Sequence, residues 1–382
     1  MFQPIVLTSK FTSTLILQLP QISRALSVAP NSRLVSVCTQ KLNFSTRTAT
    51  ALGIVPTLPP LHRRHLHNMA NGMADSTTQP PTKTKLVFQL PEHQLTEVHN
   101  TELTARHAYT SLSESDRSLL KLTPEQDASN ISVLIFASTI FHPQGGGQPS
   151  DIGFISSSTG DDSNKSKIFE ILHVRQSITN PGVVLHFGHS VNHAGSSDVT
   201  LSLNTGMTYT QHIDLDKRTL FSRYHTAGHV LGAATRTLLE DKIEGFDELK
   251  ANHFPDAASC EFKGLIDGKW KGDIQIAVDE LVKKDAEVRV EWWTKQDFRD
   301  KSLERLLPGD DVWRELGEYV NKVGKPVSNG ESDTRIRMVN IVGAEVYPCG
   351  GTHVPTTKGC GKVGVRKISR QKGMSRVSYN VD

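Results

Sequence analysis

The stretch at residues 215–240 limits the possible folds of this chain more than any other part of the sequence. Apolar residues recur in it every three or four positions, a pattern that predicts one long helix with a single buried stripe. The members of this stripe are Leu220, Tyr224, Ala227, Leu231, Ala234 and Leu238. Asp214 is suited to cap the first turn of the helix. His225 and His229 lie beside the stripe four residues apart, so a helix places both imidazoles on one face at the edge of the core.

A second pair of metal-ligating residue types lies far downstream, in the segment 348–354 (PCGGTHV), which contains Cys349 and His353. Gly350 and Gly351 disfavour a helix here and let the backbone turn tightly, so that both side chains can face one point. Three imidazoles and one thiolate form a ligand set that suits Zn²⁺. Each pair alone is a weak signal, because core or surface residues also have this spacing. Together the two pairs predict one shared zinc site.

Two further observations limit this prediction. His189 and His193 have the same spacing but lie among Gly and Asn residues, so we expect a loop that exposes both to solvent. Thr226 follows His225 where a zinc protease of the His-Glu-x-x-His type has its Glu, which disfavours protein hydrolysis. Four protein ligands usually close a structural zinc site, whereas a catalytic site keeps one position open, and the sequence alone leaves both roles open.

The rest of the pattern predicts an α+β fold. Before the long helix, short apolar runs separated by turn residues predict a small β-barrel domain. Its strands are expected at 85–90, 132–137, 168–174 and 183–187. After the helix, strands and helices mix without strict alternation, which predicts an α/β sandwich. Its strands are expected at 258–262, 288–293, 335–342, 363–368 and 375–381, and its further helices at 273–284, 303–307 and 312–319.

The first 74 residues differ in composition from the rest of the chain. They are rich in Ser and Thr and contain seven Lys or Arg but no Asp or Glu, which is typical of an organelle transit peptide, although a disordered tail is the alternative. Composition does not separate a mitochondrial from a chloroplast address. Without those seven cations, 36 basic residues face 40 acidic ones, a net charge of −4. A second start at Met69 or Met73 would leave a cytosolic form without the leader.

The expected domain order follows from these changes in pattern. A disordered leader covers 1–74 and a linker 75–85. The barrel domain covers 86–205 and the metal-binding domain 206–382. No apolar run reaches the length of about 18 residues that a membrane helix needs. We therefore expect no contact with a membrane.

The segments 225–229 (HTAGH) and 349–353 (CGGTH) together resemble the editing domain of alanyl-tRNA synthetases and of their free-standing AlaX-type relatives. The editing domain of threonyl-tRNA synthetases shares both frames, but the CGGTH form is closer to the alanyl branch. A third segment, 141–153 (FHPQGGGQPSDIG), resembles the glycine-rich motif of the β-barrel that precedes the editing domain in the longer AlaX proteins. His142 stands where relatives often carry Tyr. The resemblance covers roughly residues 86–382.

The resemblance implies hydrolysis, in trans, of the ester in alanine tRNA that is mischarged with serine or glycine. It implies Zn²⁺ as the cofactor, which either activates the attacking water or orients the serine while His225 or His229 positions the water. The metal ligands implied are His225, His229, Cys349 and His353, and the N–H groups of Gly350 and Gly351 would stabilise the oxyanion. Substrate contacts are implied for Gly145, Gly146, Gly147, Gln148 and Thr226. The glycine-rich segment lacks the Lys of a phosphate loop, and an ordinary hairpin turn is its alternative.

A nucleic-acid partner needs a local basic patch, because the chain after the leader is mildly acidic. The best candidate is the tail with Lys362, Arg366, Lys367, Arg370, Lys372 and Arg376, which would contact tRNA or form a merely solvated surface. The chain lacks the signature segments of an aminoacylation core, so we expect no tRNA charging and no need for ATP. Alternatives are a threonyl-type editor, another zinc ester hydrolase, or a non-catalytic, zinc-folded tRNA-binding protein. The oligomeric state stays open.

Overall fold

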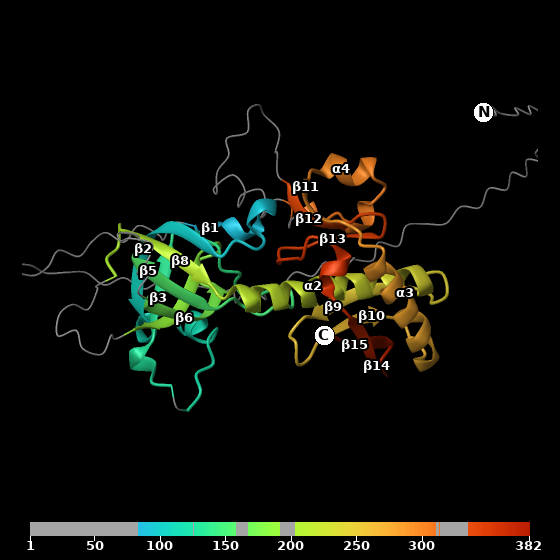
Figure 1. Cartoon of the computed structure of the whole chain (residues 1–382), viewed down its shortest axis with the longest axis horizontal. Helices are drawn as coiled ribbons and strands as arrows, with labels where there is room; N and C mark the ends of the chain where they lie inside the picture. The colour runs from blue at the N-terminus through green and yellow to red at the C-terminus, as the bar shows by residue number, and fades with distance from the viewer. Residues whose placement is uncertain (1–82, 125, 158–166, 192–202, 311–312, 314–334) are drawn as a thin grey trace, which may run out of the picture. The chain divides into compact units, whose positions relative to one another are not determined.

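The computed structural model describes residues 83–382 except 125, 158–166, 192–202, 311–312 and 314–334. All described residues fall in one compact unit. It consists of a closed barrel followed by an α/β sandwich, so the predicted α+β class is confirmed (Figure 1). The predicted leader and most of the predicted linker lie outside the described residues. Among the described residues, no helix combines the length and apolarity needed to cross a membrane.

Six antiparallel strands close the barrel in the order β2-β3-β7-β6-β5-β8. They are β2 (Val98–Ala108), β3 (Ser132–Phe136), β5 (Gly153–Ser157), β6 (Lys167–Gln176), β7 (Val184–Ser190) and β8 (Thr208–Ile213). The strands predicted around β3, β6 and β7 are confirmed. Apolar residues of all three strands share one core cluster, and alternate residues of β3 and β7 form a second cluster that packs against Leu112 and Leu119. The last strand, β8, lies beyond residue 205, so the barrel extends past the boundary expected from the sequence. Short helical turns on the barrel are η3 (Tyr109–Ser111), α1 (Glu114–Arg117) and η4 (Ala128–Asn130).

The strand predicted at 85–90 is wrong beyond its first two residues. β1 (Lys85–Leu86) pairs in parallel with β4 (Ser138–Thr139), and the chain then forms two 3₁₀ turns, η1 (Val87–Gln89) and η2 (Pro91–His93). Proline lacks the N–H that a strand ladder needs, and the buried side chains of η1 pack into the barrel core. The turns carry this segment away from the sheet.

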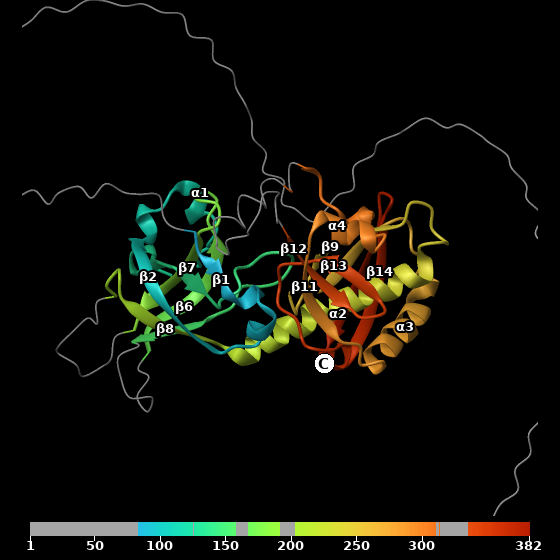
Figure 2. The same ribbon diagram turned by 90° about the horizontal axis from the view of Figure 1, so that it is seen from above.

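The long helix, α2 (Leu215–Leu239), begins directly after the barrel. The side chain of Asp214 accepts a hydrogen bond from the N–H of Lys217, as a cap is expected to do. The predicted stripe is buried at its centre and partly buried at its two ends. The opposite face is also buried, including His225, because the four-stranded sheet covers one side and β13 (Glu345–Pro348) contacts the other (Figure 2).

Two antiparallel sheets build the sandwich. One has the order β14-β15-β10-β9 and the other β11-β12-β13. The strands are β9 (Asp247–Asn252), β10 (Ser259–Lys263), β11 (Val288–Trp293), β12 (Ile336–Ile341), β14 (Val363–Gln371) and β15 (Met374–Val381). The predicted strands here are confirmed, and β9 and β13 are additional. The predicted second helix is confirmed as α3 (Lys271–Lys283), which packs beside α2.

Shorter helical elements complete the sandwich. They are η6 (Gly268–Trp270), α4 (Lys295–Asp300), η7 (Glu304–Leu306) and η8 (Thr357–Cys360). The helix expected at 303–307 is therefore only a 3₁₀ turn. The helix expected at 312–319 lies outside the described residues except for Trp313.

Candidate metal centre

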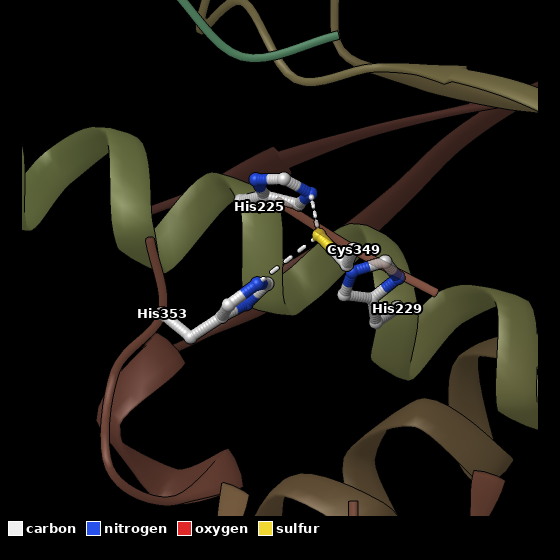
Figure 3. A group of neighbouring side chains, drawn as sticks. All are labelled: His225, His229, Cys349 and His353. Atoms are coloured by element: carbon white, nitrogen blue, oxygen red, sulfur yellow. Dashed lines mark hydrogen bonds between the residues drawn. The ribbon is translucent and has the colours of Figure 1, made fainter. Parts of the chain in front are cut away.

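The structure brings the four predicted ligands together. His225 and His229 lie on successive turns of α2, and Cys349 and His353 come from the loop after β13 (Figure 3). One ligand atom of each residue lies within 4.8 Å of the others. The Sγ atom of Cys349 lies 3.3 Å from Nε2 of His225 and 3.4 Å from Nε2 of His353.

This donor set fits a divalent ion such as Zn²⁺. Zinc bonds of about 2.0–2.3 Å at tetrahedral angles separate neighbouring donors by about 3.5 Å, close to the two distances from the sulfur. Nε2 of His229 is buried and has no hydrogen-bond partner within the described residues, and such an atom costs free energy unless a ligand satisfies it. Burial lowers the pKa of His225, His229 and His353 well below the usual value. All three rings are therefore neutral at neutral pH and keep a lone pair for a metal.

Gln148, from the glycine-rich loop of the barrel, orients His225. Its side-chain oxygen accepts hydrogen bonds from Nδ1 of His225 at 2.6 Å and from the N–H of Thr352 at 3.0 Å. Its Nε2 donates to Oγ1 of Thr352 at 2.8 Å. With the proton on Nδ1, the lone pair on Nε2 of His225 faces Cys349. Gln148 is fully buried against a candidate ligand, and the substrate contact expected for it stays a prediction.

Thr226 orients His353 in a similar way. Its hydroxyl donates to the carbonyl of Ser222 at 2.8 Å and lies 3.3 Å from Nδ1 of His353. The same hydroxyl accepts a hydrogen bond from the N–H of Val354 at 3.2 Å. Thr226 is fully buried behind the candidate ligands, and the substrate contact expected for it stays a prediction.

Two aromatic contacts at the site were missed by the sequence reasoning. The ring of Tyr347 stacks on His229 at 4.2 Å between centroids, and its hydroxyl donates to the carbonyl of His229 at 3.0 Å. Strand alternation was the available signal, because Tyr347 and Cys349 are two residues apart and share a face. The ring of His253 stacks on His225 at 4.2 Å and hydrogen-bonds the hydroxyl of Tyr379 at 2.7 Å. No local pattern marked His253.

The glycine-rich loop lies against the sandwich. Gly146 and Gly147 have φ angles of 55° and 80°, a region that favours glycine. The carbonyl of Gly147 accepts the N–H of His253 at 2.8 Å, and a Cβ there would overlap the carbonyl of Ala251. Gly145 forms a backbone bridge with Gln148. Close approach of two backbones thus explains Gly147, and the positive φ angle explains Gly146.

A buried ion pair joins the end of this loop to α2. Nε of Arg218 lies 3.0 Å from both carboxylate oxygens of Asp151, and the two side chains are 0% and 1% exposed. Asp151 also accepts the N–H of His142 at 2.5 Å, and Arg218 donates to the carbonyl of Gln94 at 2.8 Å. Burial lowers the pKa of His142 to about 4, so this residue is a neutral core side chain.

The two glycines between Cys349 and His353 differ in their surroundings. The N–H of Gly351 donates to Sγ of Cys349 at 3.4 Å, so it is directed at the sulfur. A Cβ on Gly351 would overlap the ring of His225 and lie 2.7 Å from the side-chain oxygen of Gln148. A Cβ on Gly350 would lie 3.3 Å from the flexible end of Gln89. Gly350 is exposed and its N–H stays the better candidate for an oxyanion contact.

We therefore expect Gly351→Ala to lower zinc affinity by about 10–100-fold, the range seen when the support of a metal ligand is lost. Gly350→Ala is the matched control and is expected to change it less than about threefold, because only the end of Gln89 must move. Competition against a chromophoric chelator measures both affinities. Equal affinities in the two variants would contradict this reading of the loop.

The other predicted residues lie away from this centre. The six tail residues are exposed on and beside the β14–β15 hairpin. Arg370 pairs with Asp267 at 3.4 Å and Arg376 with Glu261 at 2.6 Å. Within the described part of the chain, no ion pair is formed by Lys362, Arg366, Lys367 or Lys372.

The second histidine pair differs from the expectation. His189 lies on β7 and not in a loop, 3.5 Å from a carboxylate oxygen of Glu170. Its side chain is exposed, as expected. His193 lies outside the described residues.

Comparisons with known proteins agree with this geometry. Residues 336–378 match the family described as "Threonyl and Alanyl tRNA synthetase second additional domain". The "Alanyl-tRNA editing protein AlaX-L" of Pyrococcus horikoshii is 27% identical over 269 residues, which cover 70% of this chain and 55% of that protein. An "Alanine--tRNA ligase" of Methanosphaera stadtmanae is 29% identical over 261 residues, 65% of this chain and 24% of the ligase. The chain thus spans about half of the editing protein and a quarter of the ligase. By this domain match and these relatives, the chain is similar to the AlaX-type editing proteins, and residues 336–378 resemble the threonyl and alanyl tRNA synthetase second additional domain.

Proposed function

We propose that this protein is a zinc-dependent aminoacyl-tRNA deacylase, which hydrolyses mischarged alanine tRNA in trans and so maintains the fidelity of translation. Ser-tRNA(Ala) is the main substrate proposed and Gly-tRNA(Ala) the second. The observation that carries the proposal is the convergence of His225, His229, Cys349 and His353 within 4.8 Å. The names of the relatives, an alanyl-tRNA editing protein and alanine–tRNA ligases, support the class of substrate.

Residues of this chain would hold the metal and orient the groups that hydrolyse the ester between the amino acid and the mischarged tRNA. Zn²⁺ bound by the four ligands would supply a Lewis acid beside the ester carbonyl. Gln148 and Thr226 hold the protons on Nδ1 of His225 and His353, so that both rings present lone pairs. The N–H of Gly350, an exposed residue, would hydrogen-bond the oxyanion. A hydrogen bond to the serine hydroxyl would let the site spare correctly charged Ala-tRNA(Ala).

The test is deacylation of four purified substrates, Ser-tRNA(Ala), Gly-tRNA(Ala), Ala-tRNA(Ala) and Ser-tRNA(Thr). We expect rapid hydrolysis of the first, with activity lost on treatment with a zinc chelator and restored by Zn²⁺. Activity on Ser-tRNA(Thr) alone would favour the threonyl branch, which the matched family also includes. Bound metal without turnover of any substrate would favour a non-catalytic binding protein.

We also propose that the basic tail contacts the tRNA backbone. Replacing Arg366, Lys367 and Lys372 by Ala is expected to weaken tRNA binding and to reduce the slope of log affinity against log salt by up to about three, one per phosphate contact. The control replaces three exposed cations elsewhere, Lys121, Lys283 and Arg299. Filter binding over a range of salt concentrations measures the slope. An unchanged slope in the tail variant would reject the assignment.

The composition of residues 1–74 supports a proposal about localisation. We place the protein in the mitochondrion or the chloroplast, with a cytosolic form from the start at Met69. Fluorescent fusions with and without the first 74 residues test this, since only the longer fusion should enter an organelle. A diffuse signal from both fusions would reject the transit peptide.

A further inference from the structure

Arg337 of β12 contacts both backbone polar groups of Cys349. The carbonyl of Arg337 accepts the N–H of Cys349 at 3.2 Å, and its guanidinium donates through Nη1 to the carbonyl of the same residue. Nε of Arg337 donates to the carbonyl of Gln89 at 2.9 Å. Arg337 is only 6% exposed, so its guanidinium is held by these carbonyl groups and largely shielded from solvent. One side chain thus ties the position of Cys349 to the segment that precedes the barrel.

Gln94 in that segment holds the second ligand of the same loop. Its side-chain oxygen accepts the backbone N–H of His353 at 3.1 Å and Nη2 of Arg337 at 3.3 Å. Its Nε2 donates to the carbonyls of Phe88 at 2.5 Å and Leu90 at 3.2 Å. The N–H groups of His353 and Arg337 fix the orientation of the Gln94 amide, because a flipped amide would place its NH₂ group against both of them.

From these contacts we infer that Gln94 and Arg337 are positioning residues that set the geometry of Cys349 and His353. The two glycines give the loop many backbone conformations in the unbound state, and the Gln94–Arg337 pair selects the one in which both ligands face α2. Neither residue touches the reacting atoms. The inference rests on the proposed metal site and extends it, because it makes the turns η1 and η2 part of the centre.

The decisive variants separate the acceptor of Gln94 from its donors. Gln94→Leu removes both, whereas Gln94→Glu keeps an oxygen for the N–H of His353 and for Arg337 and loses the donors to Phe88 and Leu90. If the side chain only stabilised the N-terminal turns, both variants would fail alike. If it positions the loop, Gln94→Glu retains the function. Gln275→Leu is the matched control, since Gln275 also bridges two elements, donating to the carbonyl of Val363 at 2.9 Å and accepting the N–H of Val365 at 2.6 Å.

The readouts are zinc affinity by competition and the visible absorption of the Co²⁺-substituted full chain, which reports the geometry around the metal and its bond to sulfur. We expect Gln94→Leu and Arg337→Lys to lower affinity by about 10–100-fold and to change the spectrum. Gln94→Glu and Gln275→Leu are expected to keep the spectrum and to lower affinity less than about threefold.

A Gln94→Leu protein with unchanged affinity and spectrum would overturn the inference, and so would a Gln94→Glu protein as impaired as Gln94→Leu. In both cases the parent protein still binds metal, so the proposed function stands. A parent chain that binds neither Zn²⁺ nor Co²⁺ would contradict the metal centre itself and the positioning pair with it.

Discussion

Replacing Cys349 by Ala is expected to remove metal binding at the centre and to reduce deacylation of Ser-tRNA(Ala) by more than about 100-fold. Loss of a group that only hydrogen-bonds a metal ligand already lowers metal affinity or activity by about 10–100-fold. Cys349 is itself a candidate ligand, and it is the one of the four that brings negative charge. Without the thiolate, three buried neutral imidazoles would hold a dication with no anionic partner among the four candidate ligands. Elemental analysis of the purified protein and single-turnover deacylation measure the two effects.

Cys360→Ala is the matched control for this experiment. Cys360 is also a buried thiol of the sandwich, but it lies in η8 and takes no part in the four-ligand cluster. It is expected to keep its zinc and its activity, with a modest loss of stability from the small cavity. A Cys349→Ala protein that keeps both zinc and activity would show that the centre lies elsewhere.

Arg218→Met is expected to give the largest loss of stability among single substitutions at the barrel–helix contact. The change leaves the carboxylate of Asp151 buried without its charge partner, and breaking a buried pair in this way costs about 3–5 kcal/mol. Urea unfolding at neutral pH measures the loss. Arg289→Met is the control, because Arg289 and Glu287 form an exposed pair that solvent screens, so its loss is expected to change the stability little. A loss below about 1 kcal/mol for Arg218→Met would mean that water or another group compensates Asp151.

The metal ligands could be predicted from the sequence because their signals are local. The period of α2 places His225 and His229 on one face, and a two-glycine turn lets Cys349 and His353 converge. The supporting residues carried no such signal. Gln148 lies 77 residues from His225 in the chain and Gln94 lies 259 residues from His353, so only the fold brings them together.

The errors in the fold also have physical causes. β8 was missed because its buried residues are largely polar: Gln211 accepts the N–H of Ile140 at 3.0 Å, and His212 hydrogen-bonds Ser156 at 2.8 Å. A hydrophobic pattern does not detect a strand whose buried side chains are satisfied by hydrogen bonds. At 85–90, apolar residues suggested a strand, but Pro91 turned the chain into η2. Proline was the stronger signal there.

The arrangement of the centre has a consequence for synthesis on the ribosome. Gln94 and Gln148 emerge first, α2 follows, and the loop with Cys349 and His353 leaves the exit tunnel long after α2. The barrel can form before this loop emerges, whereas the centre can close only afterwards. Zinc at about 100 times its dissociation constant would then add about 2.7 kcal/mol to the folded state. Under the proposed zinc site, the supply of metal would therefore raise the fraction of newly made chain that is folded.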